Sequence, residues 1–571
     1  MKGEIITKQF SISAYINENH TLNVQSFHTK SMYVNSQLYT IYIQGELYNN
    51  EEICQKLKTL GYRQPKTLEE TILFAFLAWD KQAMQYLEGA YFFVIYTDKF
   101  LFCAKDPLGL IPVYYHKQDH QICISNSIEQ LLQIAEQKPI LSREGILELF
   151  AFGPGCSEDK TLYKNILSLP MGHYLHIHHG GVQIKEYYTL KAQPHTDDLT
   201  VTIQTIHDFV TTSVLQQMQN CNAGFLSGGL DSSIIISIVS RKQPLWKTYS
   251  LSYEGNKENF KSNAYQISLD DAYIAEMVQH SNVSHTSLQI TQNELITLLD
   301  EALAARQVPG MADIDSSLLW LCQNVAEQDT IILSGECADE FFGGYPWFYQ
   351  EHLKDIASFP WLNSTKERIS LLHDSYKSLP FEDYINQSYQ NTISKIDYLP
   401  EDTDEDRNAR KHTILCIHWF MQTLIARQVY MGEAAGVTIR APFANVKLLE
   451  YVYNIPWKMK FLNQEEKGLL RKAFASELPE SISHRKKNPF PKTHNPEYAQ
   501  LISQLLQERF NDPDSPLHIL FDDAKLKELI ASKGESFKLP WYGQLMSGPQ
   551  LLAYLYQIDQ WIVRYHIMIE K

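Results

Sequence analysis

The hydrophobic and polar positions divide the chain into two regions with different patterns. Up to residue 192, short β-branched and aromatic runs alternate with turn residues and with two stretches of helical spacing, which predicts an α+β domain. The expected strands are residues 39–43, 90–96, 100–104 and 121–125, and the expected helices are residues 50–60 and 67–79. The polar stretch 191–199 is typical of a linker, so we expect domains at 1–192 and 193–571.

The second region alternates short apolar strands with longer helical segments. Strand-like runs at 224–226, 248–252 and 331–333 are interleaved with helical spacing after residue 231, after residue 270 and over 316–325. This alternation predicts an α/β domain with a doubly wound parallel sheet. From about residue 364 the pattern becomes mostly helical, with helices expected at 413–430, 466–475, 498–509 and 549–565.

Composition and charge exclude several classes of protein. The 571 residues are 44% hydrophobic and 20% charged, which is ordinary for globular proteins and unlike disordered or fibrous chains. A formal net charge of −16 provides no basic face for nucleic acid or for an anionic membrane. There is no bilayer-length apolar run and no signal-peptide core, and the eight cysteines are scattered without a CxxC pair. We therefore expect a cytoplasmic protein with reduced thiols and with neither nucleic acid nor membrane as a partner.

The segment 224–233, GFLSGGLDSS, combines features of a phosphate-binding loop. Gly228 and Gly229 allow the backbone to approach an anion closely, and the helix that follows directs its free N–H groups at that anion. Three hydroxyls add further donors: Ser227, Ser232 and Ser233. Asp231 would repel a bare phosphate, which indicates a bridging Mg²⁺. The alternative is an ordinary strand–turn–helix with Ser or Asp as helix cap; the pattern is not a Walker loop, because GxxxxGK[ST] is absent.

This loop resembles the pyrophosphate-binding signature of the ATP pyrophosphatases, and the chain as a whole resembles the glutamine-dependent asparagine synthetases. Similar family segments are SGECADEFFGGY at 334–345, RAPF at 440–443, HRKKNPF at 484–490, QGELYN at 44–49 and KDPLGLIPVYY at 105–115. Residues 309–319 and 543–552 are similar to a bacterial subgroup of these enzymes. The resemblance implies an N-terminal glutaminase-like (Ntn-type) sandwich followed by an ATP pyrophosphatase domain, with ATP and Mg²⁺ as cofactors and a possible homodimer.

The resemblance also implies roles for individual residues. Pyrophosphate would be held by Ser227, Gly228, Gly229, Ser232 and Ser233, and adenosine would be enclosed by Leu226, Leu251, Ser334 and Gly335. Asp231 and Asp339 would bind Mg²⁺. Glu336 would deprotonate the attacking nitrogen, and Lys487 would stabilise the adenylating transition state, where two anions meet.

Without the family match, the charged residues of these segments do not by themselves indicate a functional site. Glu336 and Asp339 alone are typical of a solvated acidic turn, and the basic run 485–487 is as consistent with a solvated surface as with a site. Lys467 and Arg471 lie four residues apart, at helical spacing. For this pair we predict a solvated face rather than a contribution to ATP binding.

The chain also departs from the family pattern. Lys2 stands at the position of the family's nucleophilic cysteine, and Gln44 replaces an asparagine. A lysine cannot form the thioester needed for glutamine hydrolysis, so we expect a degenerate glutaminase domain in residues 1–192. In the second domain, Cys337 replaces a glycine and Asn445 stands where an aspartate often follows.

Three functions remain open. The first is an ATP-dependent amide-forming ligase that adenylates an aspartate-like carboxylate and uses ammonia or an amine. The second is a lasso-peptide macrolactam cyclase, which acts on an Asp or Glu side chain of a precursor peptide alongside a leader protease; a β-lactam synthetase is a weaker relative of it. The third is a non-catalytic scaffold, which the intact loop and its charged residues disfavour.

Overall fold

The computed structural model describes residues 10–16, 22–118, 121–178, 181–262, 268–537 and 540–570. The chain divides into two compact units, Met1–Ile140 with Ser157–Lys191 and Leu141–Cys156 with Ala192–Lys571. The short segment Leu141–Cys156 belongs to the second unit although it precedes the linker. It carries helix α4 (Arg143–Ala151), and the buried Arg368 donates to the Phe150 carbonyl oxygen at 3.0 Å.

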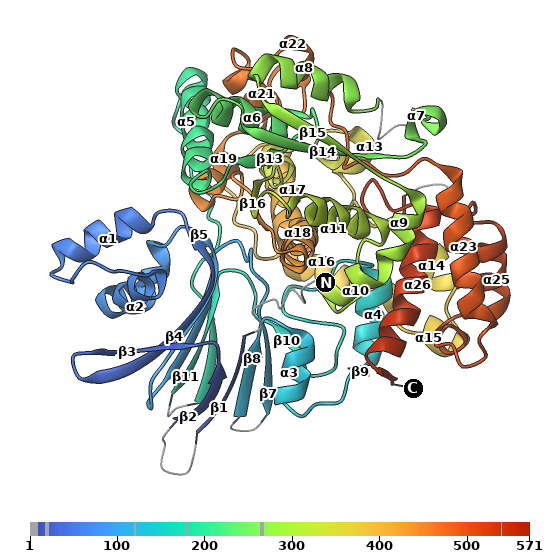
Figure 1. Ribbon diagram of the computed structural model, residues 1–571, viewed down its shortest axis with the longest axis horizontal. Coiled ribbons are helices and arrows are strands. Elements are labelled where there is room, and N and C mark those ends of the chain that lie inside the picture. The colour runs from blue at the N-terminus through green and yellow to red at the C-terminus, as the bar shows by residue number, and fades with distance from the viewer. Residues whose placement is uncertain are drawn as a thin grey trace. The chain divides into compact units, whose positions relative to one another are not determined.

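Two antiparallel sheets build the first unit (Figure 1). One sheet has the strand order β10-β7-β8-β1-β2 and the other β12-β11-β6-β5-β4-β3. The strands are β1 (Ser11–Ile16), β2 (Leu22–Phe27), β3 (Lys30–Val34), β4 (Gln37–Leu47), β5 (Gly89–Tyr96), β6 (Leu101–Lys105), β7 (Tyr114–Gln118), β8 (Gln121–Ser125), β10 (Leu167–Ser168), β11 (His173–His178) and β12 (Gly181–Glu186). The helices are α1 (Asn50–Thr59), α2 (Leu68–Trp79), the short 3₁₀ helix η1 (Asp80–Gln85) and α3 (Ile128–Ile134).

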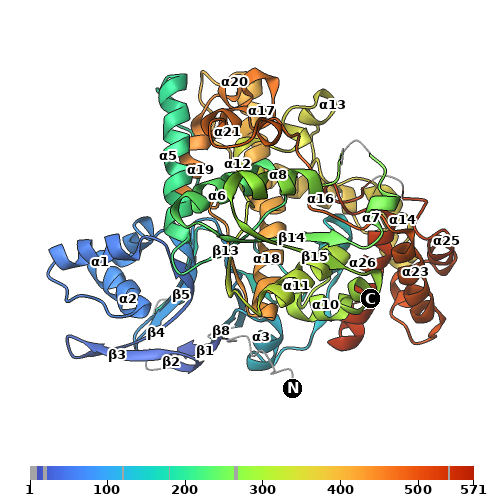
Figure 2. The same ribbon diagram turned by 45° about the horizontal axis from the view of Figure 1, so that its top comes forward.

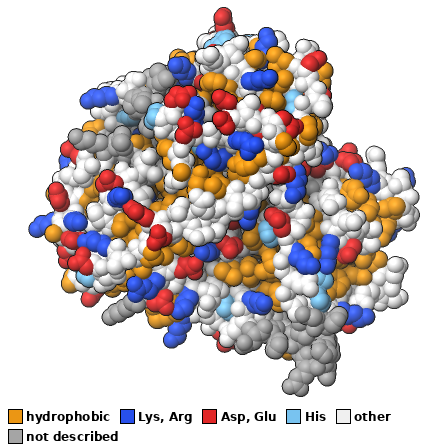
Figure 3. Space-filling view, turned by 180° about the vertical axis from the view of Figure 1, so that it is seen from behind, with side chains coloured by type: hydrophobic (Ala, Val, Ile, Leu, Met, Phe, Trp, Pro, Cys, Tyr) orange, Lys and Arg blue, Asp and Glu red, His pale blue; other side chains and the backbone are white. Residues whose placement is uncertain are grey.

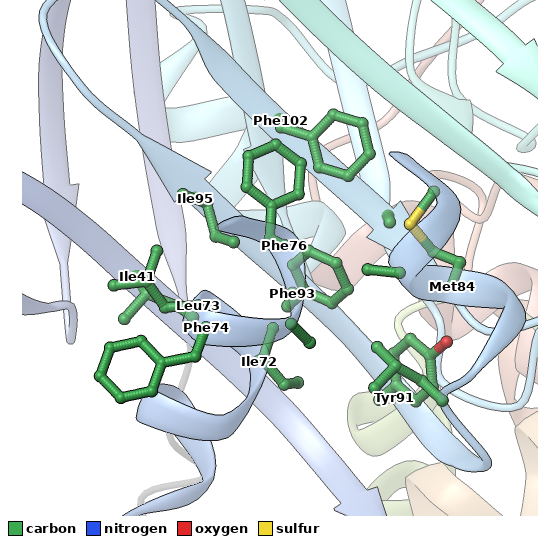
Figure 4. Close-up of a cluster of buried hydrophobic side chains, with 14 of the residues drawn as sticks. Ile41, Ile72, Leu73, Phe74, Phe76, Met84, Tyr91, Phe93, Ile95 and Phe102 are labelled. Atoms are coloured by element: carbon green, nitrogen blue, oxygen red, sulfur yellow. The ribbon is translucent and has the colours of Figure 1, made fainter. Parts of the chain in front are cut away.

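Side-chain alternation along β5 explains how these layers pack. Phe92 and Val94 point into the core shared by the two sheets, whereas Phe93 and Ile95 point into the core beneath α1 and α2. Figure 4 shows Phe93 and Ile95 beside residues of α2. A strand with both faces buried reads as a continuous apolar run, which is why the sequence predicted β5 well.

The predicted α+β sandwich is confirmed. All four predicted strands and both predicted helices are present, although β4 is several residues longer than expected. The strands that were not predicted are β1, β2, β3, β7, β10, β11 and β12. Their sequences mix polar and apolar residues because they lie near sheet edges or expose one face.

The second unit is built on a five-stranded parallel sheet of order β15-β14-β13-β16-β17. The strands are β13 (Ala223–Phe225), β14 (Lys247–Tyr253), β15 (Ser284–Ile290), β16 (Ile331–Leu333) and β17 (Thr438–Arg440). Helices α6 (Leu230–Lys242) and α8 (Asp271–Ser281) lie on one side of it, and α11 (Asp313–Val325) and α18 (Met421–Ala435) on the other (Figures 1 and 2). The doubly wound arrangement is therefore confirmed.

Most of the remaining second unit is helical, as predicted. These helices are α5 (Leu199–Gln217), α7 (Asn256–Asn259), α9 (Gln292–Thr297), α10 (Leu299–Arg306), α12 (Ala338–Phe342), α13 (Glu351–Lys354), α14 (Thr365–Ser370), α15 (Asp374–Lys377), α16 (Phe381–Ile393), α17 (Asp404–Leu415), α19 (Val446–Asn454), α20 (Trp457–Lys460), α21 (Gly468–Phe474), α22 (Glu480–Ser483), α23 (Pro496–Asn511), α24 (Leu517–Leu520), α25 (Asp523–Ala531) and α26 (Gly548–Arg564). Short 3₁₀ turns occur at Pro346–Phe348 and Leu462–Gln464, and a π-helical stretch at Cys416–Phe420 joins α17 to α18. Two short strands, β9 (Ile140–Leu141) and β18 (Met568–Ile569), complete the elements.

The cysteines, the apolarity of the helices and the surface charges can be compared with what the composition predicted. All eight cysteines lie within the described residues and carry thiols rather than disulfides. Among the helices that the structure describes, none has the length and apolarity needed to cross a bilayer. On the face shown in Figure 3, acidic and basic side chains are interspersed.

Candidate functional site

A pocket lies where parallel strands of the second unit end. The loops that leave β13 and β16 line it, together with residues of β14, α18 and the segment before α23. Carboxyl-end edges of parallel sheets are the usual place for ligands in such folds, because the loops diverge there.

The loop after β13 has the geometry expected of a phosphate loop. Gly228 adopts a left-handed φ of 65°, and a Cβ there would lie 2.7 Å from the Tyr273 Cβ, so only glycine fits without strain. The hydroxyls of Ser227 and Ser232 lie 3.1 Å apart, and Gly229 begins α6 as its N-cap residue. The N-terminus of α6 is thereby presented to the pocket.

The structure does not bring every predicted loop residue to the pocket wall. Leu226, Ser227, Gly229, Asp231 and Ser232 line it. By contrast, Gly228 serves the turn, and Ser233 is fully buried with no hydrogen-bond partner for its hydroxyl.

The loop after β16 packs directly against the first loop. A Cβ on Gly335 would lie 2.9 Å from the Ser232 backbone nitrogen, so this position requires glycine. Cys337 has a φ of 77°, the left-handed region that favours glycine, which explains why a glycine is usual here. The turn directs Glu336 to the pocket and begins α12, which carries Asp339.

Two lysines and two aspartates meet at this point. The Nζ of Lys467 lies 2.7 Å from Oδ2 of Asp231 and 2.6 Å from Oδ1 of Asp339. The Nζ of Lys487 lies 2.5 Å from Oδ2 of Asp339. Gly344 makes room for the pair, since a Cβ there would lie 2.0 Å from Oδ1 of Asp339 and 2.9 Å from Cε of Lys467.

The predicted solvated face for Lys467 and Arg471 is therefore wrong. Lys467 is 2% exposed and Arg471 is 4% exposed. Lys467 precedes α21 with a left-handed φ of 55°, which turns its side chain away from the helical face that the spacing suggested. Arg471 donates to the Ser483 carbonyl oxygen at 2.7 Å and to Oε1 of Glu466 at 2.7 Å.

The charges around Asp339 shift its titration. Burial alone would raise the pKa of Asp339, but Lys467 and Lys487 outweigh burial and hold that pKa well below its usual range. Burial would lower the pKa of Lys487, but Asp339 and Asp231 raise it above its usual value. The neighbouring Glu340 shows the opposite result, because burial and the nearby Asp339 raise its pKa to about 8. Lys487 and Asp339 are thus kept charged, and Glu340 is kept largely neutral near pH 7.

The basic run near Lys487 is ordered by specific contacts rather than solvated throughout. Arg485 is buried; it donates to the Ser227 carbonyl oxygen at 3.1 Å and to Oδ1 of Asp270 at 2.5 Å. The backbone nitrogen of Lys487 donates to Oε1 of Glu466 at 3.0 Å. Lys486 alone in this run is exposed.

The solvated acidic turn considered for Glu336 and Asp339 is likewise absent, since Asp339 is only 8% exposed. Oε1 of Glu336 accepts from Nη2 of Arg427 at 3.2 Å, and Gln428 donates to the Ser334 hydroxyl at 2.8 Å. Leu251, Ser334 and Gly335 also line the pocket.

Sequence reasoning assigned Lys467 to a solvated face and did not name Arg427 or Gln428. No motif carried them, because they come from α18 and from the turn before α21, far along the chain from the two loops.

Mg²⁺ fits the donor set at the centre of this cluster. Asp231 and Asp339 are hard oxygen donors, and both contact one ammonium, so they face the same small volume. Within the described ranges, no group of three or more His, Cys, Asp or Glu side chains could hold a metal alone. Two protein carboxylates, completed by phosphate oxygens and water, are the usual way in which proteins hold Mg²⁺ beside a nucleotide.

Of the two predicted degenerate glutaminase positions, Lys2 and Gln44, the structure describes one. Lys2 lies outside the described residues. Gln44 lies on β4, and its Oε1 accepts from Nδ2 of Asn126 at 2.7 Å. Next to it, Gly45 has a φ of 101°, and a Cβ there would lie 2.0 Å from the Ala90 carbonyl oxygen. The glycine is required by the close β4–β5 pairing.

In a comparison with known proteins, two family profiles match successive parts of the chain. The profile of the family Asparagine synthase matches residues 206–562, and that of the Glutamine amidotransferase domain matches residues 20–188. The chain is 39% identical over 548 residues to "Asparagine synthetase [glutamine-hydrolyzing] 3" of Bacillus subtilis, covering 93% of this chain and 88% of that protein. It is 24% identical over 551 residues to "Asparagine synthetase [glutamine-hydrolyzing] 1" of the same organism, covering 88% of this chain and 84% of that protein.

Among solved structures, a glutamine phosphoribosylpyrophosphate amidotransferase from B. subtilis is similar at 11% identity over 38% of this chain and 55% of its own, with a TM-score of 0.23. A likeness this slight supports no argument. The Asparagine synthase profile and the 39% identical relative establish the family, and they confirm the resemblance found from the motifs. The chain therefore belongs to the asparagine synthase family and is an ATP-dependent carbon–nitrogen ligase with an N-terminal domain of the glutamine amidotransferase type.

Proposed function

We propose that this chain adenylates the side-chain carboxylate of an aspartate-like substrate and then transfers the acyl group to ammonia or an amine. The observation that supports it most is the meeting of Asp231, Asp339, Lys467 and Lys487 beside the phosphate loop. The two aspartates balance the two lysines, so the cluster would gain the positive charge that a polyanionic nucleotide needs when Mg²⁺ binds the aspartates.

In the first step, a carboxylate oxygen of the substrate attacks the α-phosphorus of ATP and pyrophosphate leaves. The N-terminus of α6 and the Ser227 and Ser232 hydroxyls bind the leaving pyrophosphate, and Lys487 offsets the negative charge that accumulates between the two anions. Asp231 and Asp339 would hold Mg²⁺, which would supply further neutralisation of phosphate charge when bound. Leu226 and Leu251 offer apolar contacts to the base.

In the second step, the nitrogen attacks the acyl carbon and AMP leaves. The nitrogen must lose a proton to become amide, and the carboxylate of Glu336 accepts it. Arg471 and Glu466 support this chemistry indirectly, because Glu466 binds the Lys487 backbone and Arg471 binds Glu466.

We also propose that the chain itself does not hydrolyse glutamine. Lys2 stands where the family has its nucleophilic cysteine. The cysteines of the first unit do not replace it: Cys54, Cys103 and Cys123 are buried, and burial raises the pKa of Cys103 to about 12. A buried, protonated thiol is a poor nucleophile.

Pyrophosphate release from ATP and Mg²⁺ tests the proposal. Purified protein with aspartate and ammonium should release pyrophosphate, and Asp231→Asn should reduce release at least about 100-fold while the protein stays folded. No release with aspartate, with other small carboxylates or with Asp- and Glu-containing peptides would overturn it. Release with a precursor peptide but not with aspartate would favour the macrolactam cyclase. Glutamate formation from glutamine by the pure protein would refute the statement on Lys2.

A further inference from the structure

The segment 485–495, which we call the strap, carries Lys487 along the pocket wall. It lies between α22 and α23 and contains neither helix nor strand. Its backbone therefore lacks the regular hydrogen bonds that fix the position of a helix or a strand. Ordering such a segment costs conformational entropy at every residue, so the position of Lys487 depends on groups outside the strap that hold it.

Asp270 holds the strap close to Lys487. Its Oδ1 accepts from Nη2 of Arg485 at 2.5 Å and from Nδ2 of Asn488 at 2.9 Å. The same Nδ2 of Asn488 donates to the Ser268 carbonyl oxygen at 3.0 Å. Because Arg485 and Asn488 flank Lys487 in the sequence, these contacts fix the strap where the lysine leaves it.

Asn256 holds the strap further along. Its buried side chain donates from Nδ2 to the Lys492 carbonyl oxygen at 2.9 Å and accepts at Oδ1 from the His494 backbone nitrogen at 2.7 Å. One amide thereby pairs with an acceptor and a donor of the strap backbone, as a neighbouring strand would. The Tyr253 hydroxyl donates to the Pro491 carbonyl oxygen at 2.8 Å and strengthens the same attachment.

Both attachments come from one connection of the sheet. β14 ends at Tyr253 and α8 begins at Asp271, so Asn256, Ser268 and Asp270 all belong to the connection between them. β14 pairs with β13, the strand that leads into the phosphate loop. The strap is therefore fastened beside that loop, and the connection sets how far Lys487 lies from it.

We propose that Asn256 is a positioning residue, which acts on the adenylating step through the strap and Lys487. This inference rests on the proposed function, which assigns Lys487 the task of offsetting negative charge in that step. Of the residues that the structure describes, Lys487 lines the pocket and Asn256 does not. A displacement of about 1 Å in a reacting group can cost about 100-fold in rate, so losing this attachment should slow turnover rather than weaken ATP binding.

Steady-state kinetics of the full chain test the proposal. Asn256→Leu keeps the size of the side chain but removes its donor and its acceptor. It should lower the kcat for pyrophosphate release with ATP and aspartate about 10- to 100-fold, with a KM for ATP that changes less than about threefold. Asn259→Leu is the matched control, since Asn259 lies on the same helix and donates only to the Gly255 carbonyl oxygen, at 2.8 Å, within the connection itself. It should behave as wild type.

Hydrogen exchange separates positioning from a general loss of folding, and it needs no activity. In Asn256→Leu, and in the smaller change Asn256→Ser, amides of the strap such as that of His494 should exchange at least about 10-fold faster than in the wild type. Amides of β13 and β16 should keep their wild-type rates, because the sheet does not depend on the strap.

Three results would overturn the inference. Faster exchange in the strap with a wild-type kcat would show that the attachment has no bearing on Lys487. A lower kcat without faster exchange in the strap would show that Asn256 acts by another route. Faster exchange in β13 and β16 as well, in both variants, would reduce Asn256 to a residue of general stability. Failure of the proposed function looks different, since the wild type itself would then release no pyrophosphate, and the inference would fall with it.

Discussion

Each unit buries a lysine and an aspartate, but it uses them differently. In the first unit, Asp106 is completely buried and accepts from the backbone nitrogens of Leu108 at 3.0 Å and Leu110 at 2.9 Å, while Lys105 donates to the Leu169 carbonyl oxygen at 3.3 Å. In the second unit, Asp339 is held by two lysine side chains. Backbone partners are fixed by the fold, whereas lysine ammoniums can exchange a carboxylate for a phosphate.

The pKa values show the same contrast. Burial raises the pKa of Asp106 to about 6, since backbone donors and Lys105 only partly offset it. The two lysines reverse that effect at Asp339. The pKa of Asp339 stays low because of two lysine ammoniums that line a pocket, whereas Asp106 is held by backbone donors in a turn.

The largest expected effect concerns Lys467. Lys467→Met should lower pyrophosphate release at least about 100-fold, because Asp231 and Asp339 would face each other in a buried place without the shared cation. Steady-state pyrophosphate release with ATP and aspartate measures it. The control is Lys472→Met, at an exposed lysine on α21, which should keep full activity. Full activity of Lys467→Met would show that the lysine partners of Asp339 are structural, as the backbone partners of Asp106 are.

An intermediate effect, on stability alone, is expected for Asp106. Its pKa is raised in the folded state, so ionisation disfavours folding: stability is lost as the pH rises from about 4 to about 6 and is constant above that. Asp106→Asn should remove this dependence, a difference of about 2 kcal/mol between wild type and variant across that range. Hydrogen exchange of β5 and β6, corrected for intrinsic rates, measures it.

The exposed Asp98→Asn is the control for this experiment. Pyrophosphate release by Asp106→Asn should match that of the wild type. A loss of release, or a pH dependence equal to that of the wild type, would show that Asp106 is more than part of a turn.

The smallest effect is expected at Asn445. Its side chain accepts from the Leu448 backbone nitrogen at 3.1 Å and caps α19. Aspartate caps equally well, so Asn445→Asp should change the free energy of unfolding by less than about 0.5 kcal/mol, whereas Asn445→Ala should cost about 1 kcal/mol. Chemical denaturation measures both. A large loss of activity in Asn445→Asp would instead assign this position to substrate recognition.

Much of this molecule could be predicted from the sequence because its signals are local. These signals include the β-branched and aromatic runs of β4 and β5, the apolar strand–glycine–helix unit at β13 and α6, and the glycines of the turn at Gly228 and Gly229, which all depend on residues close together in the chain. Strands with mixed polarity, such as β2, β12 and β15, were missed because their partners rather than their own residues stabilise them.

What the sequence determined by itself is therefore the two-part architecture, the glycine-rich loop after β13 and the family, and it also named the carboxylates of the proposed site. Only the tertiary structure decided which cationic side chains pair with Asp231 and Asp339. Lys467 and Arg471 are spaced like a solvated helical pair, yet a left-handed turn and the absence of a side chain at Gly344 bring Lys467 between two aspartates. Arg427 has no local signal at all, because a buried charge is recognised only by the groups that distant segments place, or fail to place, around it.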